Sequence, residues 1–460
     1  MFAFGTNTMI AGNLLRRFRS FVAKPDAIDS SLLAFFVCRV LQVSSQLAGT
    51  LSTETHPKLN WQQCTISGGC KTVSGSIVLD AEWRWIHQVG SYTNCFIGNI
   101  WNTTICYSNK QCSKNCQLEG ADYSSYGIST SDIYLLANET NYQPFRPLNQ
   151  EFSVDVDVSA LSCDSNGAIS FLQMDLDGGK GRFGNNQAGA QFGTGYCSSK
   201  CPRDLKFISG EANAEGWTPS NIDPLSGSGN YGSCCGEMDV WESNSFANAF
   251  AAHSCDVGSQ NRCTDAACGT AAAPYSGVCD PDGCDFNAYR LGNQSFYGPS
   301  KTLDSNKKIM VVTQFVTDSN TADGMLTEIR RKYIQSGKVL ANPTVQVSGS
   351  FNSIKSQYCG NEKSLFGDVD AFGKHGGLNQ VGKGLGTGMV LSFSLLNDAA
   401  TRFLWLDSRY PVDKDPSIPG VARGRCGPEP PATLLVDPGA QCVAVYSNIK
   451  FGDIGTSGGL

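Results

Sequence analysis

Apolar and polar residues alternate along several segments of the chain, and this pattern predicts β-strands. From Phe152 to Val158 the alternation is strict, which predicts a strand with one buried face and one solvent-exposed face. Segment 308–316 is apolar on both faces, as in a strand inside a sandwich. Segments 389–395 and 443–446 read the same way, and no long helical pattern competes with them. The pattern predicts an all-β protein, a single β-sandwich or jelly-roll domain with long loops.

Composition agrees with this fold class and narrows the range of partners. The 460 residues can bury a large core, and 17% charged residues with 50 glycines suit a loop-rich β protein. The formal charge of −6 at pH 7 comes without any basic cluster, which argues against a nucleic-acid partner. Uncharged polymers remain suitable partners.

The chain has 20 cysteines, far more than a protein of the reducing cytosol carries. Zinc binding is the alternative to disulfides, but there are only 4 histidines and no CxxC pair. Disulfides are therefore expected, and with them secretion. Three N-x-S/T sequons, at Asn102, Asn138 and Asn293, fit that route as glycosylation candidates.

The first 47 residues predict a leader. Residues 31–48 contain an apolar run followed by small residues, as in a signal peptide, although Arg16, Arg17 and Arg19 precede it and Arg39 interrupts it. An organelle transit peptide is the alternative interpretation of such an arginine-rich start. We favour the signal peptide. The run is too short to cross a membrane, and no other segment reaches the required length.

Three carboxylates, Glu237, Asp239 and Glu242, follow directly after the pair Cys234-Cys235. Two neighbouring carboxyl groups, one ionised and one protonated, are the groups that hydrolyse glycosidic bonds, and Trp241 between them is a side chain suited to stack on a sugar ring. A solvated acidic patch or a calcium site is the alternative.

Strand geometry sets a condition on this cluster. Residues two apart share a face, so Glu237 and Asp239 point the same way, whereas Glu242 is five positions from Glu237 and points to the other face. If all three carboxylates meet in one cleft, the strand must bulge near Val240 and Trp241. Asp239 would then lie beside Glu237 and raise one of the two pKa values.

The chain from about 49 to 455 resembles glycoside hydrolase family 7. The resemblance rests on separated motifs: Glu54-Thr-His-Pro57, Asp80-Ala-Glu-Trp-Arg-Trp85, Tyr196-Cys-x-x-x-Cys-Pro-Arg-Asp-Leu-Lys206, Glu237-x-Asp-x-x-Glu242, Cys279-Asp-Pro-Asp-Gly-Cys284 and Trp405-Leu-Asp-Ser408. It implies a concanavalin-like jelly roll of two curved antiparallel sheets, with long disulfide-tied loops forming a cleft or tunnel. Residues 48–460 would form the catalytic domain, with no linker or carbohydrate-binding module and no cofactor or metal.

The resemblance also implies roles for individual residues. Glu237 resembles the nucleophile, Glu242 the general acid/base, Asp239 the carboxylate that orients Glu237, and His253 a histidine near the leaving-group side. The reaction would retain configuration, for which the carboxyl groups lie ~5–5.5 Å apart. Substrate-binding positions carried over from the family are Trp83, Trp85, Trp405, Tyr196, Asp204, Lys206, Asp282, Asp285, Tyr410 and Arg423. For each tryptophan, a place in the core is the alternative.

Several positions depart from the family pattern. Leu396 stands where the family has a further stacking tryptophan, Ser170 where it has a tyrosine, and Pro274 where it has an arginine. Roughly two strands' worth of family sequence is absent between about Ser131 and Ile133. Either the chain is a trimmed variant or an exon was omitted from the coding sequence, and we favour the omission. An unpaired sheet edge would be one consequence.

Cysteine pairing is implied by the same resemblance. One family bridge is absent, with Gly49 and Gln117 at its two positions, Cys38 falls in the leader, and Cys442 is left unpaired. The two bridges that join the 197–201 segment to Cys234 and Cys235 would fix the nucleophile strand. The expected pairs are Cys64–Cys70, Cys95–Cys116, Cys106–Cys112, Cys163–Cys426, Cys197–Cys235, Cys201–Cys234, Cys255–Cys279, Cys263–Cys268 and Cys284–Cys359.

The implied activity is hydrolysis of β-1,4-glucosidic bonds in cellulose. Segments 255–284 and 409–426 are long, as in family members whose loops roof the cleft, so a secreted, monomeric cellobiohydrolase is expected, with glucan chains as partner and neither nucleic acid nor membrane. An endo-β-1,4-glucanase of the same family is the first alternative. A non-catalytic glucan-binding jelly roll is the second.

Overall fold

The structure is a computed structural model that describes residues 46–123, 131–270, 272–396, 398, 400–428 and 443–458. The chain divides into two units, 1–42 and 43–460, and everything below concerns the second. Residues 1–45 of the expected leader, with Cys38, and residue Cys442 lie outside the described residues. Leu47, the last residue of the expected leader, belongs to the short strand β1 (Leu47–Ala48).

One sheet has nine strands and carries the catalytic-site candidates. Its main order is β10-β9-β31-β13-β19-β20-β22, with β11 on β31 and β4 on β9, and all of its pairings are antiparallel. The strands are β4 (Ser76–Leu79), β9 (Ser131–Asn138), β10 (Asn141–Tyr142), β11 (Pro144–Phe145), β13 (Asn166–Leu172), β19 (Glu237–Ser243), β20 (Asn248–His253), β22 (Cys284–Asp285) and β31 (Met389–Leu396).

The second sheet has eight strands in the order β27-β26-β25-β12-β32-β2-β3, with β30 on β26. Its pairings are antiparallel except for the parallel pair β2 and β32. The strands are β2 (Trp61–Thr65), β3 (Gly69–Val73), β12 (Gln150–Asp157), β25 (Ile309–Thr317), β26 (Leu326–Gln335), β27 (Lys338–Ala341), β30 (Ser353–Ile354) and β32 (Val445–Asp453).

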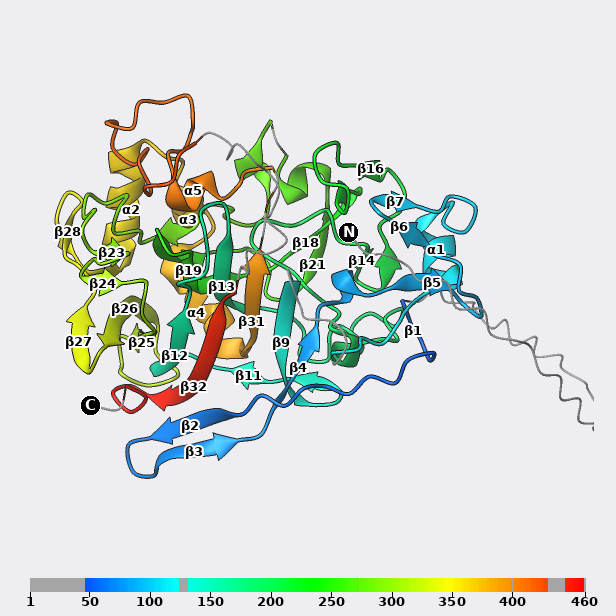
Figure 1. The fold of residues 1–460 in the computed structure, drawn as a ribbon, viewed down its shortest axis with the longest axis horizontal. Helices are drawn as coiled ribbons and strands as arrows, with labels where there is room; N and C mark the ends of the chain where they lie inside the picture. The colour runs from blue at the N-terminus through cyan, green and yellow to red at the C-terminus, as the bar shows by residue number, and fades with distance from the viewer. Residues whose placement is uncertain are drawn as a thin grey trace, which may run out of the picture. The chain divides into compact units, whose positions relative to one another are not determined.

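The two sheets face each other, and their inner side chains form one large core (Figure 1). Phe152 and Val154 of β12 meet Ile169 and Phe171 of β13 in this core, each with at most 1% of its surface exposed. Burying such side chains contributes about 1.5–3 kcal/mol each. The β-sandwich jelly roll predicted from the sequence is confirmed.

Strand β12 corrects one prediction. The alternation from Phe152 to Val158 predicted a solvent-exposed face, but Ser153 and Asp155 are buried as well. At Ser153 the cause is the turn at residues 455–457, which Glu151 holds against the strand by accepting hydrogen bonds from the backbone of Gly455 and Ser457. Asp155 is paired instead with Lys308, whose Nζ lies 2.8 Å from its carboxylate.

The described part of the chain contains five α-helices in the connections, although the sequence showed no long helical pattern. The two longest have 11 residues each, and α4 contains four glycines in GLNQVGKGLGT, which hides it from propensity-based prediction. Helix α4 packs on β26 and β20, where a Cβ at Gly382 would lie 2.9 Å from Leu326. The helices are α1 (Asn109–Asn115), α2 (Ser356–Phe366), α3 (Ala371–Lys374), α4 (Gly377–Thr387) and α5 (Leu404–Asp407).

Short strand pairs and 3-10 turns complete the described elements. They are β1 (Leu47–Ala48), β5 (Ile86–Gln88) and β8 (Cys116–Leu118), which form a three-stranded sheet, then β6 (Phe96–Ile97) with β7 (Ile100–Trp101), β14 (Phe207–Ile208) with β15 (Glu211–Ala212), β16 (Thr218–Pro219) with β17 (Gly227–Ser228), β18 (Tyr231–Cys234) with β21 (Asn261–Thr264), β23 (Tyr297–Gly298) with β24 (Leu303–Asp304), β28 (Val345–Gln346) with β29 (Ser350–Phe351), and the turns η1 (Ala81–Trp83), η2 (Ala190–Phe192), η3 (Asp265–Cys268) and η4 (Pro274–Ser276).

The described residues contain nine disulfides, and all nine are the pairs expected from the resemblance. At the position of the absent bridge, Gly49 donates a backbone hydrogen bond of 2.6 Å to Leu118. Ahead of it, β1 pairs with β8, with Leu47 opposite Gln117. Strand pairing therefore joins the two segments where the family has a disulfide.

Strand β9 begins at Ser131, where family sequence is expected to be absent. It pairs with β31 on one side and with β4 and β10 on the other. The expected unpaired edge is therefore wrong for this strand. The preceding residues 124–130 lie outside the described part of the chain.

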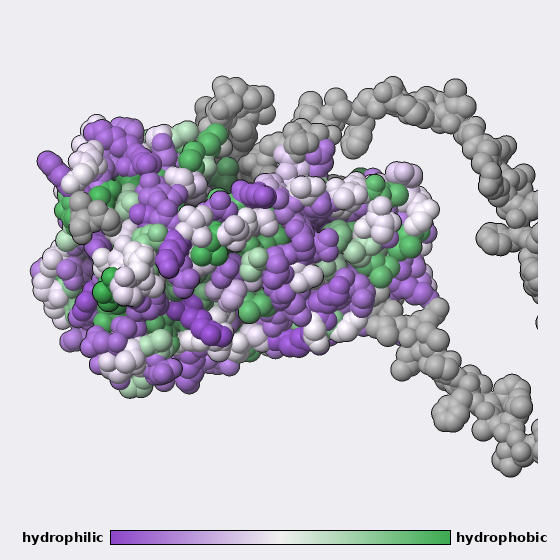
Figure 2. Space-filling view, turned by 90° about the horizontal axis from the view of Figure 1, so that it is seen from below, coloured by the Kyte–Doolittle hydropathy of each residue, from purple (hydrophilic) through white to green (hydrophobic). Residues whose placement is uncertain are grey.

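None of the helices in the described residues is long and apolar enough to span a membrane. Figure 2 shows the face that lies below in Figure 1, and hydrophilic residues dominate it, with the hydrophobic ones in small separate patches. The candidate glycosylation sites differ in exposure: Asn138 is exposed, while Asn102 and Asn293 are half-buried.

Candidate active site

The three carboxylates lie on β19, and this strand bulges where the sequence requires it. Opposite β13 the register shifts by one residue between Asp239 and Trp241, which leaves Val240 without a partner. Opposite β20 the register shifts between Asp239 and Glu242. Because one residue is inserted, Glu242 returns to the face of Glu237 and Asp239. The predicted bulge is confirmed.

Trp241 does not reach this face. Its side chain is fully buried in the core between the sheets. Its interpretation as a sugar-stacking residue is therefore wrong, because the same bulge that turns Glu242 outward leaves Trp241 pointing inward.

Two cavities meet at Glu242. The smaller, of about 150 Å³, is lined by all three carboxylates and by side chains from β13 and β31. The larger, of about 470 Å³, extends over β20 toward the loops around residues 274–282 and 398–423. Glu242, Lys200 and Trp405 line both cavities, so they mark the junction.

Glu237 is held by a short turn that precedes it in sequence. Its Oε2 accepts hydrogen bonds from the Ser198 hydroxyl at 2.8 Å, the Ser199 backbone at 2.9 Å and the Ser199 hydroxyl at 2.7 Å. No described residue donates to Oε1. Disulfides at either end of this turn, Cys197–Cys235 and Cys201–Cys234, tie it to the residues just before β19.

Asp239 lies between a hydroxyl and an imidazole. The Ser170 hydroxyl, from β13, donates to Oδ1, and His253 Nε2 lies 3.0 Å from Oδ2. His253 Nδ1 is 3.0 Å from the Asp280 carbonyl, which can only accept, so Nδ1 carries a proton. Gly283 has a φ of +73°, and a Cβ there would come within 2.7 Å of the imidazole. A glycine at this position leaves room for His253.

Burial and mutual charge separate the pKa values of these groups. Burial and the Asp239 charge raise the pKa of Glu242 to about 8. Burial also raises the pKa of Glu237, and the Asp239 charge raises it further. Burial alone would raise the pKa of Asp239, but His253 outweighs it and the pKa is lowered. Burial opposes protonation of His253, yet Asp239 raises its pKa to about 10.

Asp239 and His253 therefore form an ion pair at neutral pH. Glu242 keeps its proton there, because its pKa lies near 8. A protonated Glu242 in a cavity shared with two further carboxyl groups is placed for general acid catalysis.

Five of the predicted substrate-binding residues line the larger cavity: Trp405, Asp282, Asp285, Tyr410 and Arg423. One of their charges is paired within the protein, since Asp285 lies 2.6 Å from Arg290. Asp282 accepts a 2.6 Å hydrogen bond from the neutral Tyr275 hydroxyl. The structure brings these five residues together beside Glu242 and His253.

The remaining predicted residues extend in the other direction. Tyr196 lines the smaller cavity and also a neighbouring small cavity that Glu82 lines. Lys206 Nζ pairs with the Glu82 carboxylate at 2.8 Å, and Asp204, two residues earlier in the chain, is exposed.

Trp83 and Trp85 are 45% and 38% exposed, so the alternative of core tryptophans is wrong for both. The indole of Trp85 stacks on His87 with ring centroids 4.1 Å apart. Neither indole lines the two cavities at the carboxylates.

The departures from the family pattern lie at the cavities. Leu396 lines the smaller cavity and packs beside Phe403 and Trp405, and Pro274 lines the larger. Ser170 replaces an aromatic ring but supplies a hydroxyl to Asp239. The Ser170 side chain therefore supports the carboxylate cluster.

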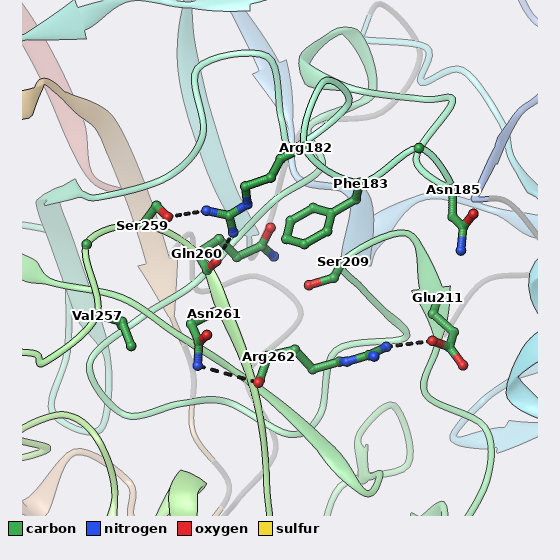
Figure 3. Close-up of a pocket in the computed structure, with 12 residues that line it drawn as sticks. Arg182, Phe183, Asn185, Ser209, Glu211, Val257, Ser259, Gln260, Asn261 and Arg262 are labelled. Atoms are coloured by element: carbon green, nitrogen blue, oxygen red, sulfur yellow. Dashed lines mark hydrogen bonds and ion pairs between the residues drawn. The ribbon is translucent and has the colours of Figure 1, made fainter.

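A separate depression of about 760 Å³ lies between segments 182–185, 209–211 and 257–262 (Figure 3). Arg182 donates there to Ser259 and to the Gln260 carbonyl, and Arg262 pairs with Glu211 at 2.6 Å. It contains none of the predicted site residues, and its one carboxylate is neutralised. The candidate catalytic residues line the other two cavities instead.

Three groups among the described residues lie close enough together to hold a metal ion, each built around cysteines. Every cysteine in them is disulfide-bonded and lacks the free thiolate that metal binding needs. These groups are explained by the disulfides.

Sequence reasoning missed the residues of the 198–200 turn: Ser198, Ser199 and Lys200. The signal was present, since they lie between the two cysteines expected to be bonded to Cys234 and Cys235. A segment clamped to the start of the nucleophile strand must place its side chains beside the first carboxylate.

Neighbouring buried carboxylates at the junction of two cavities fit a glycoside hydrolase. The chain matches the family described as Glycosyl hydrolase family 7 over residues 48–133 and 130–457, and it belongs to that family. The two matched stretches meet at 130–133, where family sequence is expected to be absent.

Solved structures from three organisms are similar over 89% of this chain. A family 7 cellobiohydrolase from Daphnia pulex is 40% identical, is covered over 99% of its length and has a TM-score of 0.86. A cellobiohydrolase from Melanocarpus albomyces, solved with cellotetraose, is 38% identical, 99% covered and has a TM-score of 0.82. The Humicola insolens endocellulase EGI is 30% identical, 99% covered and has a TM-score of 0.72.

Proposed function

We propose that this protein hydrolyses β-1,4-glucosidic bonds of cellulose with retention of configuration and releases mainly cellobiose from chain ends. The observation that carries the proposal is the convergence of Glu237, Asp239 and Glu242 on one face of β19. Its support comes also from the cellobiohydrolases of Daphnia pulex and Melanocarpus albomyces, which are more similar to this chain than the Humicola insolens endocellulase is.

In the first step Glu242 donates its proton to the leaving oxygen while Glu237 bonds to the anomeric carbon. The three donors on Oε2 fix the Glu237 carboxylate and leave Oε1 available for attack. In the second step Glu242, now ionised, accepts a proton from water, which displaces Glu237 and regenerates both groups.

Asp239 and His253 act as positioning residues in this scheme. The His253 imidazolium neutralises Asp239, so the Asp239 carboxylate can lie near Glu237 without forcing Glu237 to take up a proton. The Asp239 charge still helps to keep Glu242 protonated.

Exo action is supported by the walls of the larger cavity. Segment 255–284 is tied by Cys255–Cys279 and Cys263–Cys268, and it contributes Tyr275 and Asp282. Segment 409–426 contributes Tyr410 and Arg423 to the same cavity. Walls that enclose a product site favour release of short fragments. Leu396 stands where the family has a tryptophan, and Pro274 where it has an arginine. The loss of these two sugar-binding side chains favours the endoglucanase alternative.

Product analysis distinguishes the two modes. We expect cellobiose as the main soluble sugar from crystalline cellulose, measured by chromatography, with slow loss of viscosity in carboxymethylcellulose. Rapid viscosity loss with a mixture of oligosaccharides would establish the endo mode instead.

The raised pKa of Glu242 predicts the alkaline limit of activity. Hydrolysis needs protonated Glu242, so kcat/KM should be retained below pH 8 and fall as the pH rises through about 8. On the acid side it should fall as Glu237, whose pKa is also raised, becomes protonated. Initial rates on an aryl cellobioside from pH 3 to 10 give the profile. In Glu242→Gln, the residual activity should no longer fall as the pH rises through about 8. If it still falls there, the alkaline decrease belongs to another titrating group.

We propose further that the enzyme acts outside the cell as a monomer, with glycans on one or more of Asn102, Asn138 and Asn293. Nine disulfides support an oxidising compartment. The face shown in Figure 2 lacks a large hydrophobic patch of the kind that joins subunits.

A further inference from the structure

The turn that holds the nucleophile also places a cation at the junction of the two cavities. Ser198 and Ser199 bind Glu237, and Lys200 follows directly, with its backbone N–H donating to the Ser198 hydroxyl at 3.1 Å. The adjacent disulfides at Cys197 and Cys201 fix this turn. The backbone of Lys200 is therefore held as firmly as Ser198 and Ser199, which bind Glu237.

The Lys200 ammonium lies over the face of Trp405. Its Nζ is 4.7 Å from the ring centroid, within the range of a cation–π contact. Both residues line both cavities, so this face of the ring belongs to the open cleft rather than to the core.

No described residue accepts a hydrogen bond from Lys200 Nζ or lies within ion-pair distance of it. Lys206 offers the contrast, since its Nζ is tied to the Glu82 carboxylate and the Glu82 carbonyl. The three N–H donors of Lys200 are thus free to bind a ligand. The charges of Glu237 and Asp239 attract the ammonium and keep it in the cleft.

An aromatic face can hold either an ammonium or a sugar ring, but not both at the same place. A cation–π contact at a solvent-exposed site is weak enough to be exchanged when a ligand arrives. The displaced ammonium remains within reach of the ring, because its turn is fixed, and its donors then face the hydroxyl groups of whatever lies on Trp405.

We propose that Lys200 is a specificity-determining residue for the sugar that stacks on Trp405. That sugar displaces the ammonium from the indole and receives hydrogen bonds from it through its hydroxyl oxygens. The inference rests on the proposed function, since it requires a glucan across the junction at Glu242. It predicts a preference for leaving groups that carry sugar hydroxyls over those that do not.

The test compares two substrates that differ on the leaving side. Cellotetraose cleaved in the middle places a sugar on Trp405, whereas 4-nitrophenyl cellobioside places a ring without sugar hydroxyls there. For Lys200→Met, kcat/KM on cellotetraose should fall about tenfold, mainly through KM, as expected for loss of a charged hydrogen bond. On the aryl substrate it should change by less than about twofold. Each variant is measured at its own pH optimum, which removes the effect of the lost charge on the carboxylates.

Two further variants complete the design. Lys200→Arg should recover most of the cellotetraose activity, because a guanidinium also stacks on indole and donates hydrogen bonds. Lys338→Met, on β27 of the other sheet and exposed, is the matched control and should equal the native enzyme on both substrates.

The outcomes separate this inference from the proposed function. An equal loss on both substrates, or no loss on either, overturns the role of Lys200 while leaving hydrolysis intact. If the native protein cleaves neither substrate, or if Glu237→Gln cleaves both as well as the native protein does, the proposed function itself has failed.

Discussion

Replacing Glu237 by glutamine should lower kcat on both cellotetraose and an aryl cellobioside by at least about 10⁴-fold, the size of loss typical when a covalent nucleophile is removed. Glutamine has the same shape, and its amide can keep some of the contacts with Ser198 and Ser199. It cannot form the glycosyl ester. Because both substrates require this bond, the loss should not depend on the leaving group.

The fold should tolerate this change, which makes it a clean test. The midpoint of thermal unfolding should stay within a few degrees of the native value, and cellobiose should still bind when measured by calorimetry. Glu211→Gln is a matched control, since Glu211 pairs only with Arg262 in the separate depression of Figure 3. Native-like turnover by Glu237→Gln would remove the nucleophile assignment.

Replacing Glu242 by glutamine should have a large effect that does depend on the leaving group. On cellotetraose we expect a loss of about 10²–10⁴-fold, the contribution typical of general acid–base catalysis. With 2,4-dinitrophenyl cellobioside the leaving phenolate needs no proton, so the first step should slow by roughly tenfold or less. The glycosyl-enzyme should then accumulate, because no base activates water.

Added azide distinguishes this role from a structural one. Azide attacks the glycosyl-enzyme without base assistance, so it should restore turnover of Glu242→Gln and yield β-cellobiosyl azide, which is detected by NMR. The β configuration would also establish retention. An α product, or no acceleration by azide, contradicts the proposed double displacement.

The site was predictable to the extent that it depends on side-chain periodicity. The spacing of Glu237, Asp239 and Glu242 required a bulge, and the register of β13 and β20 contains it. The spacing gave no information on Lys200, because a loop residue's position depends on the disulfides that anchor it rather than on a repeat.

In the fold, too, the elements set by side-chain periodicity were predictable, and those set by contacts distant in sequence were not. Strands β25 and β31 follow from their apolar runs. The burial of Ser153 on β12 does not, because the residues that cover it, Gly455 and Ser457, are about 300 positions away in sequence. Helix α4 was missed because its glycines oppose helix formation, and contact with β26 stabilises it instead.

The bulge at Val240 has a consequence for how this chain can vary. Side chains of a strand point alternately to its two faces, so residues in odd and even positions lie on opposite faces. The inserted residue changes this parity once, between Asp239 and Glu242. Any substitution in this segment leaves the parity intact. Loss of Val240 or Trp241 would remove the bulge, and Glu242 would keep its face but lie one residue nearer to Glu237 along the strand. Loss of the bulge with all residues kept would instead direct Glu242 into the core and Trp241 into the cleft. Catalysis here depends on the number of residues in β19 as much as on their identity.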